Sequence, residues 1–393
     1  MIVMAFRGSV LFVMLFLGAV APGSAGAGKT SREAARGPDR VRVGEALARA
    51  AGCLERDRDG ASFRDPYLTY VYPGEHLPSP PGAPPLTYRN VDADAILILI
   101  GKELGASGSA RAALAPMIGQ AETAIAGAVA TWRGRGFSNV RVGARPGGIA
   151  LDTYCTVGWL KRDAIMAEEA EATLQADGWL PVALYDSGDE FRLIADESWC
   201  LRLIAATGRL GQDARRVLER HAAVFRDHAR ERPGDIGTFY EALHLGMVLA
   251  EPSLRRARQG LMGEVVAALQ GWAAAHGPGG RTDPRDLLEW ANLASADVLR
   301  IPSISAGDHL RGDAARIVLD MQQDDGCWAS PGAGPPRAGA TFLTLRAVLA
   351  LAQWSGKAGE DAGDAGGPAE VGQSEAGPGG EANPAPQARR PAQ

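Results

Sequence analysis

The sequence predicts an all-α fold, and more narrowly an (α/α)6 barrel, or toroid, in which six outer helices surround six inner helices. Three observations lead to this fold class. Six amphipathic helical runs each precede a more apolar run, no convincing series of strands interrupts them, and a Gln/Gly/Trp corner follows two of the outer runs. A helix with one apolar stripe lies at the surface, whereas a helix that is apolar all round must be buried.

The helical runs alternate along the chain. The amphipathic runs, expected on the outside, cover residues 43–58, 115–133, 161–176, 212–231, 252–276 and 308–323. The apolar runs, expected on the inside, cover residues 90–104, 150–160, 195–207, 235–250, 286–299 and 339–354. Together they predict one domain over residues 43–355, large enough to bury a substantial core.

The two ends of the chain have compositions that differ from that of a folded domain. Residues 1–27 fit a secretory signal peptide, because Arg7 precedes an apolar run and Ala25-Gly26-Ala27 matches an Ala-x-Ala cleavage site. An uncleaved N-terminal anchor is the alternative, although the apolar run is short for a membrane span. Residues 28–42 are expected to be a charged tail, and residues 356–393, rich in Gly, Ala and Pro, a disordered tail. We therefore expect a secreted or periplasmic protein with no membrane span after signal cleavage.

The composition indicates which binding partners are expected and whether the cysteines can form disulfides. The formal net charge of −5 argues against nucleic acid as the main partner, because nucleic-acid-binding surfaces are basic. A small molecule or a glycan in the mouth of the barrel is expected instead. Four cysteines, Cys53, Cys155, Cys200 and Cys327, allow one or two disulfides in an oxidising compartment.

A long loop is expected over residues 59–88, between the first outer and the first inner helix. This stretch is rich in proline and tyrosine, a composition that excludes a helix. Loops of this length inside a compact domain commonly carry function.

The corner motif runs from Gln323 to Trp328 (Gln-Asp-Asp-Gly-Cys-Trp), with an earlier copy from Gln175 to Trp179 (Gln-Ala-Asp-Gly-Trp). The copies are separated by about three repeats of roughly 49 residues, the length of a helical hairpin. Gly is expected to end the outer helix in a conformation that a Cβ disfavours. The Gln amide would satisfy backbone groups at the helix end, and the Trp would pack between neighbouring hairpins.

This Gln-x-Asp-Gly-x-Trp pattern resembles the repeat signature of the terpenoid-cyclase and protein-prenyltransferase toroids. It is also similar to loops in six-hairpin glycosidases. The resemblance covers residues 43–354 in architecture and implies a toroid fold, but fold alone does not imply an activity.

Acidic residues open most of the inner helical runs. In an (α/α)6 barrel the inner helices run in one direction, so these residues would gather at one mouth. Helix dipoles would keep the carboxylates ionised there. The alternative interpretation is that each acid only caps its helix. The acids at helix starts are Asp92, Asp94, Asp152, Asp196, Glu197, Asp235 and Asp286, with Asp186, Asp189 and Glu190 on the same rim.

Two carboxylates across a concave mouth suit glycosidic cleavage. We therefore expect a carbohydrate-active hydrolase or lyase, with Asp94 and Asp152 as the acid/base pair and Asp196 as a third catalytic candidate. Aromatic side chains near the acidic ends would hold a sugar. The expected substrate-binding residues are Asp92, Tyr154, Glu197, Trp199, Asp235, Tyr240 and His244. The alternative for His244 is a satisfied core residue, and core packing is the preferred interpretation for Trp159 and Phe239.

Two other functions stay open. The segment Asp92-Ala93-Asp94-Ala95 is similar to the Asp-x-Asp-Asp acid motif of class II terpene cyclases, with Ala95 replacing the last Asp. That resemblance implies an isoprenoid substrate, an apolar cavity and Asp94 as the acid. The third hypothesis is a non-catalytic toroid that binds a ligand or a protein.

No cofactor is expected, with one alternative. Cys155, Cys200 and His244 lie near the starts of successive inner runs, and two Cys with one His can bind Zn²⁺ with an open fourth position. The lanthionine-cyclase toroids use such a ligand set, although their Cys-His-Gly motif is absent here. A Cys155–Cys200 disulfide and a role as small buried hydrophobes are the competing interpretations.

Overall fold

The computed structural model describes residues 38–59, 62–65, 68, 88–105, 109–135, 148–176, 190–208, 210–257, 260–277, 283–301, 304–329 and 339–363. This part of the chain is almost entirely helical, so the all-α class is confirmed. The expected signal peptide at residues 1–27 lies outside the described residues, as do most of the two expected tails. Helix α2 already begins at Arg40, and helix α14 continues to Gly363, so each end of the expected domain is extended by a few helical residues.

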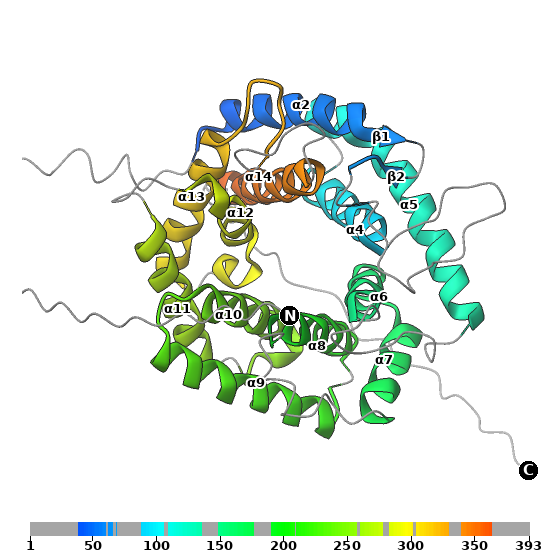
Figure 1. The fold of residues 1–393 in the computed structure, drawn as a ribbon, viewed down its shortest axis with the longest axis vertical. Coiled ribbons are helices and arrows are strands. Elements are labelled where there is room, and N and C mark those ends of the chain that lie inside the picture. The colour runs from blue at the N-terminus through cyan, green and yellow to red at the C-terminus, as the bar shows by residue number, and fades with distance from the viewer. Residues whose placement is uncertain are drawn as a thin grey trace, which may run out of the picture.

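Outer and inner helices alternate along the described chain (Figure 1). The helices on the outside are α2 (Arg40–Asp57), α5 (Ser109–Arg135), α7 (Ala164–Ala176), α9 (Gln212–Glu231), α11 (Leu261–His276) and α13 (Ser305–Asp320). The helices closer to the centre are α4 (Tyr88–Glu103), α6 (Gly148–Lys161), α8 (Glu190–Ala206), α10 (Ile236–Leu249), α12 (Leu287–Ser295) and α14 (Ala340–Gly363). Each expected helical run corresponds to one of these helices.

The burial of α9 and α10 shows why the two kinds of helix occupy different layers. Helix α9 buries one stripe, at residues 214, 217, 218, 221, 222 and 225, and exposes the rest. Helix α10 buries residues on several sides, at positions 237, 238, 239, 241, 242, 245, 246, 248 and 249. Asp235 caps the start of α10, since its Oδ1 accepts a hydrogen bond from the amide of Gly237 at 2.8 Å.

Most inner helices pack on the next inner helix along the chain, and the last packs on the first. Helix α4 packs on α6, α6 on α8, and α8 on α10. The short 3-10 helix η5 (Asp297–Arg300) follows α12 and packs against α10 and α13. Helix α14 packs on α12, on α4 and on α2, so the end of the described chain contacts its beginning (Figure 1). Two further 3-10 helices, η3 (Pro252–Leu254) and η4 (Pro284–Asp286), lie in connections.

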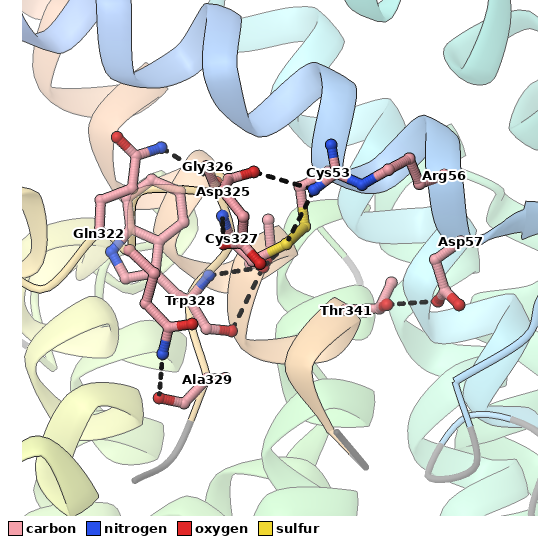
Figure 2. The surroundings of a disulfide bond; sticks show 12 residues. Cys53, Arg56, Asp57, Gln322, Asp325, Gly326, Cys327, Trp328, Ala329 and Thr341 are labelled. Atoms are coloured by element: carbon pink, nitrogen blue, oxygen red, sulfur yellow. Dashed lines mark hydrogen bonds between the residues drawn. A yellow bond between two sulfur atoms is a disulfide. The ribbon is translucent and has the colours of Figure 1, made fainter. Parts of the chain in front are cut away.

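A disulfide joins the first outer helix to the segment before the last inner helix (Figure 2). Cys53 of α2 is bonded to Cys327, and Arg56, one turn later, donates a hydrogen bond to the carbonyl of Asp325 at 2.9 Å. The hydroxyl of Thr341, in the first turn of α14, donates to the carboxylate of Asp57. Covalent and polar contacts therefore fix the N-terminal hairpin to the C-terminal one.

Asp65 strengthens the same contact. Its two carboxylate oxygens accept hydrogen bonds from the amides of Gly339, at 2.7 Å, and Thr341, at 2.9 Å. Amides at a helix start have no partner within the helix, so α14 is capped by a residue far away in the sequence. The pKa of the neighbouring Asp57 is raised, chiefly because the carboxyl group is buried.

The corner from Gln323 to Trp328 differs from its expected form in one respect. Helix α13 ends at Asp320, so Gly326 does not end the helix but turns the chain beyond it, with φ of +84°. A Cβ at Gly326 would lie 2.5 Å from the carbonyl oxygen of Arg49 in α2, which is why glycine is required. Trp328 is fully buried as expected, and its indole nitrogen donates to the carbonyl of Val318 at 2.7 Å.

The amide that spans this corner belongs mainly to Gln322 and not to Gln323. The Gln322 amide donates to the carbonyl of Ala46 at 2.8 Å. It also donates to the carbonyl of Gly326 at 3.0 Å (Figure 2). The side-chain amide of Gln323 donates a longer hydrogen bond, of 3.4 Å, to the carbonyl of Ala329, and its backbone amide donates to the carbonyl of Cys327 at 2.9 Å. In the earlier copy of the motif, residues 177–179 lie outside the described residues.

The expected long loop at residues 59–88 begins with a small hairpin that the sequence analysis did not predict. Strands β1 (Arg58–Asp59) and β2 (Ser62–Phe63) pair antiparallel. Of the remainder, Leu68 is described and is buried, and its carbonyl accepts a hydrogen bond from the Asn90 amide of α4 at 3.1 Å.

Candidate functional site

A cavity of about 750 Å³ lies between the inner helices. Every inner helix contributes to its wall, together with η5 and Leu68 from the long loop. Its size suits a small organic ligand, since ligand pockets commonly measure about 300–1,000 Å³.

A network of ion pairs forms part of the cavity wall. The side chains come from the C-terminal ends of inner helices and from η5, not from the helix starts where the sequence analysis expected charge. Arg300 pairs with Glu103 at 3.2 Å, and Arg202 pairs with Glu251 at 3.1 Å. Arg202 also pairs with Asp297, which joins the two halves of the network. The carboxylates in these pairs already have hydrogen-bonding partners.

Trp159 connects this network to an aromatic surface. Its indole nitrogen donates to Glu251 at 2.7 Å, and the guanidinium of Arg202 lies 3.8 Å from its ring centroid. Trp199 approaches edge-on with ring centroids 5.8 Å apart. Both rings line the cavity, so the interpretation of Trp159 as core packing alone is corrected.

A second group of lining residues has fewer internal partners. Tyr240 and His244 lie one turn apart on α10, with ring centroids 6.4 Å apart and nearly parallel planes. The Tyr240 hydroxyl donates to Glu289 at 2.6 Å. Nδ1 of His244 is buried and has no hydrogen-bond partner among the described residues. Arg346 of α14 lines the same cavity.

The imidazole of His244 is neutral at pH 7. Its pKa is lowered to about 4, chiefly because the imidazole is buried, with smaller contributions from the nearby Arg346 and His221. A neutral imidazole has an unprotonated nitrogen, so His244 can accept a proton or a hydrogen bond from a ligand.

The structure brings four of the expected site residues to the cavity. Asp92, Trp199, Tyr240 and His244 all line it. Asp92 is held by the hydroxyl of Thr153, which donates to Oδ1 at 2.6 Å. These residues come from the inner helices α4, α8 and α10.

Asp94, the first expected catalytic residue, lies elsewhere. Its side chain is fully buried and pairs with Arg58 at 2.8 Å. Burial raises the pKa of Asp94 to about 6, while the charge of Arg58 opposes the rise, so the pair is ionic at pH 7. Asp94 is not among the residues that line the cavity. Its catalytic role stays a prediction, and the geometry favours a structural one.

Three expected substrate-binding residues also have partners away from the cavity. Glu197 contacts His221 and Arg220 of α9. Tyr154 donates from its hydroxyl to Glu169. Asp235 caps α10, as the alternative interpretation expected. The side chains of Asp152 and Asp196 lie outside the described residues, as do Asp186 and Asp189, so nothing is concluded about them.

Cys155 and Cys200 form a disulfide between α6 and α8. Both sulfur atoms are used in that bond, so the structure has the disulfide alternative and not a thiolate pair for zinc. Among the described residues no group of three or more His, Cys, Asp or Glu side chains is arranged to hold a metal ion.

The sequence analysis missed several lining residues. Arg202, Asn292 and Arg346 lie inside runs interpreted as apolar inner helices. A charged residue within such a run is rarely buried without a partner, so Arg202 and Arg346 each indicated a cavity or an ion pair.

Comparisons with family models, with curated proteins and with solved structures found no match. Within the described part of the chain, none of the helices is sufficiently long and apolar to span a lipid bilayer.

Proposed function

We propose that this chain is a six-hairpin (α/α)6 toroid that is secreted or periplasmic and acts on a carbohydrate in its central cavity. The alternation of outer and inner helices supports the toroid. The signal-like N-terminus supports export, and two disulfides are compatible with an oxidising compartment.

The observation that carries the proposal is the composition of the cavity wall. Two tryptophans and a tyrosine line the cavity, and His244 presents a neutral imidazole beside Tyr240. Aromatic faces with a few convergent polar groups are typical of small-molecule sites. Asp92 adds a carboxylate that can accept hydrogen bonds from sugar hydroxyls.

In this proposal His244 is the general base, and it replaces the pair Asp94 and Asp152 as the leading catalytic candidate. The lining carboxylates Glu103, Glu251 and Asp297 are held by arginines and are poor candidates for proton transfer. A base can serve a hydrolase by activating water, or a lyase by removing a proton from the sugar. A terpene-cyclase-like function has less support, because the cavity is partly charged and Asp94 does not line it.

A panel of polysaccharides tests the proposal. New reducing ends would report cleavage of any kind, and unsaturated ends that absorb ultraviolet light would report a lyase. His244→Gln is expected to reduce turnover about 10²–10⁴-fold, the usual contribution of a general base. Arg230→Gln, at an exposed position on α9, is the matched control. Binding without cleavage would favour the non-catalytic toroid, and full activity of the His244→Gln protein would refute the assignment.

A further inference from the structure

The arginines that line the cavity differ in whether they pair with a carboxylate. Arg162, Arg202 and Arg300 each pair with a carboxylate. Arg346 also lines the cavity, but no carboxylate among the described residues pairs with it. Its Nε is buried without an acceptor, and its guanidinium lies 5.3 Å from the ring centroid of Phe342.

An unpaired guanidinium in a partly buried position is unfavourable, because its charge has lost water without gaining an anion. Arg346 is half-buried on an inner helix otherwise rich in buried apolar residues. Its neighbour His244 is neutral and cannot compensate the charge. The cavity therefore contains a local positive charge that an anionic ligand group would neutralise.

We propose that Arg346 binds a carboxylate group of the ligand, so that the substrate class is an acidic sugar such as a uronic-acid oligosaccharide. The sugar part of this inference rests on the proposed function, whereas the anion part rests on Arg346 itself. The planar fork of a guanidinium matches the two oxygens of a carboxylate and can bind both.

A carboxylate fits this position better than a phosphate. A phosphate monoester carries close to two negative charges at neutral pH and needs more than one cation. The other cavity arginines are already used by Glu103, Glu251 and Asp297. Arg346 alone matches the single charge of a carboxylate.

The electrostatics of His244 support this inference. Burial is the main cause of its low pKa, and the charge of Arg346 is the next contribution. Arg346 is thus close enough for its charge to act on the imidazole. A ligand carboxylate on Arg346 would consequently lie near the proposed base.

Binding measurements on the full-length protein test the inference. The fluorescence of Trp159 and Trp199 in the cavity wall provides the signal. The probes are a neutral oligosaccharide, its uronic-acid counterpart, a sulfated counterpart and a simple aromatic carboxylate. Arg346→Gln removes the charge, Arg346→Lys keeps the charge without the fork, and Arg230→Gln is the surface control.

The wild-type protein should bind the uronic-acid oligosaccharide at least about tenfold more tightly than the neutral one, as expected for hydrogen bonds to a charged group. Arg346→Gln should abolish this preference and leave neutral binding unchanged, and Arg346→Lys should weaken it severalfold. Arg230→Gln should keep the full preference. Melting temperatures confirm that each variant is folded, and Arg346→Lys decides the result if Arg346→Gln is not.

The other outcomes separate the two proposals. Equal binding of neutral and acidic sugars that is insensitive to Arg346 would overturn the anion site and leave the proposed function standing. Arg346-dependent binding of the aromatic carboxylate without any sugar binding would support the anion site and overturn the carbohydrate function. A preference for the sulfated probe over the uronic acid would overturn the assignment to a carboxylate. Absence of all binding would overturn both proposals.

Discussion

His244 shows how the cavity controls the chemistry of a single residue. Its Nδ1 has no partner among the described residues, and its side chain faces the cavity. Burial keeps the imidazole neutral, because removal from bulk water disfavours its charged form. The arrangement costs stability whenever the unfolded chain can bind a proton that the folded chain cannot.

This linkage gives a pH prediction. The pKa of His244 is about 4 in the folded protein and about 6.5 in the unfolded chain. The unfolded state therefore binds more protons between these values, and His244 lowers stability as the pH falls from 6.5 toward 4. The loss approaches about 3 kcal/mol at pH 4, and above pH 7 it vanishes.

Urea unfolding of wild-type and His244→Gln proteins at several pH values between 4 and 8 measures this effect. Other titrating groups are common to both proteins and cancel in the difference. The variant should gain stability relative to wild type on acidification. His309→Gln, which changes an exposed histidine, should not. Parallel stability curves for wild type and His244→Gln would contradict the assigned environment.

Among the described connections between elements, the corner after α13 requires a glycine for two reasons. Gly326 has a positive φ and lies against the backbone of Arg49 in α2. Gly105, after α4, also has a positive φ, of +65°, but no atom lies within 4 Å of a Cβ built there. Comparing Gly105 with Gly326 therefore distinguishes the cost of a positive φ alone from the added cost of a steric overlap with the backbone of α2.

Alanine at each position tests this distinction. Gly105→Ala should cost about 1 kcal/mol, from the left-handed conformation alone. Gly326→Ala should cost about 2–4 kcal/mol, because the overlap with a backbone carbonyl adds to the strain. Denaturant unfolding of the two variants gives the difference directly. Equal losses would mean that the corner adjusts without disturbing α2.

The helices of this fold could be predicted from the sequence, and the contacts between them could not. The periodicity of apolar residues is a local property, so the alternation of outer and inner helices was readable. Asp94 opens an apolar run as a cap would, but its partner Arg58 comes from the end of an outer helix. The ion pairs of the cavity wall were not predicted, because acidic residues are favoured as caps at helix starts and the prediction therefore placed the charged site there. Arg202 and Glu251 meet only when α8 and the end of α10 lie side by side.

At the scale of the whole molecule, the two disulfides connect different parts of the fold. The Cys53–Cys327 bond connects residues 274 positions apart and joins the first hairpin to the last. The Cys155–Cys200 bond spans 45 positions and joins two inner helices. In the chain-entropy model a longer loop constrains the unfolded chain more, so each bond taken alone contributes about 5.6 and about 4 kcal/mol, respectively.

The smaller loop is nevertheless the one closer to the ligand. Cys155 precedes Thr156, and Cys200 follows Trp199, and both neighbours line the cavity. Loss of this bond would let α6 and α8 shift relative to each other. It should therefore weaken ligand binding more than loss of the Cys53–Cys327 bond does, although it destabilises the fold less.

Two variants that retain one disulfide each, Cys53→Ala/Cys327→Ala and Cys155→Ala/Cys200→Ala, separate these effects. Comparing each variant in its oxidised and reduced forms isolates the cross-link from the packing of the substituted side chains. Urea unfolding should show the larger oxidised-to-reduced loss in the variant that keeps Cys53–Cys327. Tryptophan-detected ligand binding should change on reduction only in the variant that keeps Cys155–Cys200. A smaller stability loss in the variant that keeps Cys53–Cys327 would mean that the contacts of Asp57 and Asp65 with α14 already hold the ends together without the covalent bond. A change in binding on reduction of that same variant would contradict the role assigned to Cys155–Cys200.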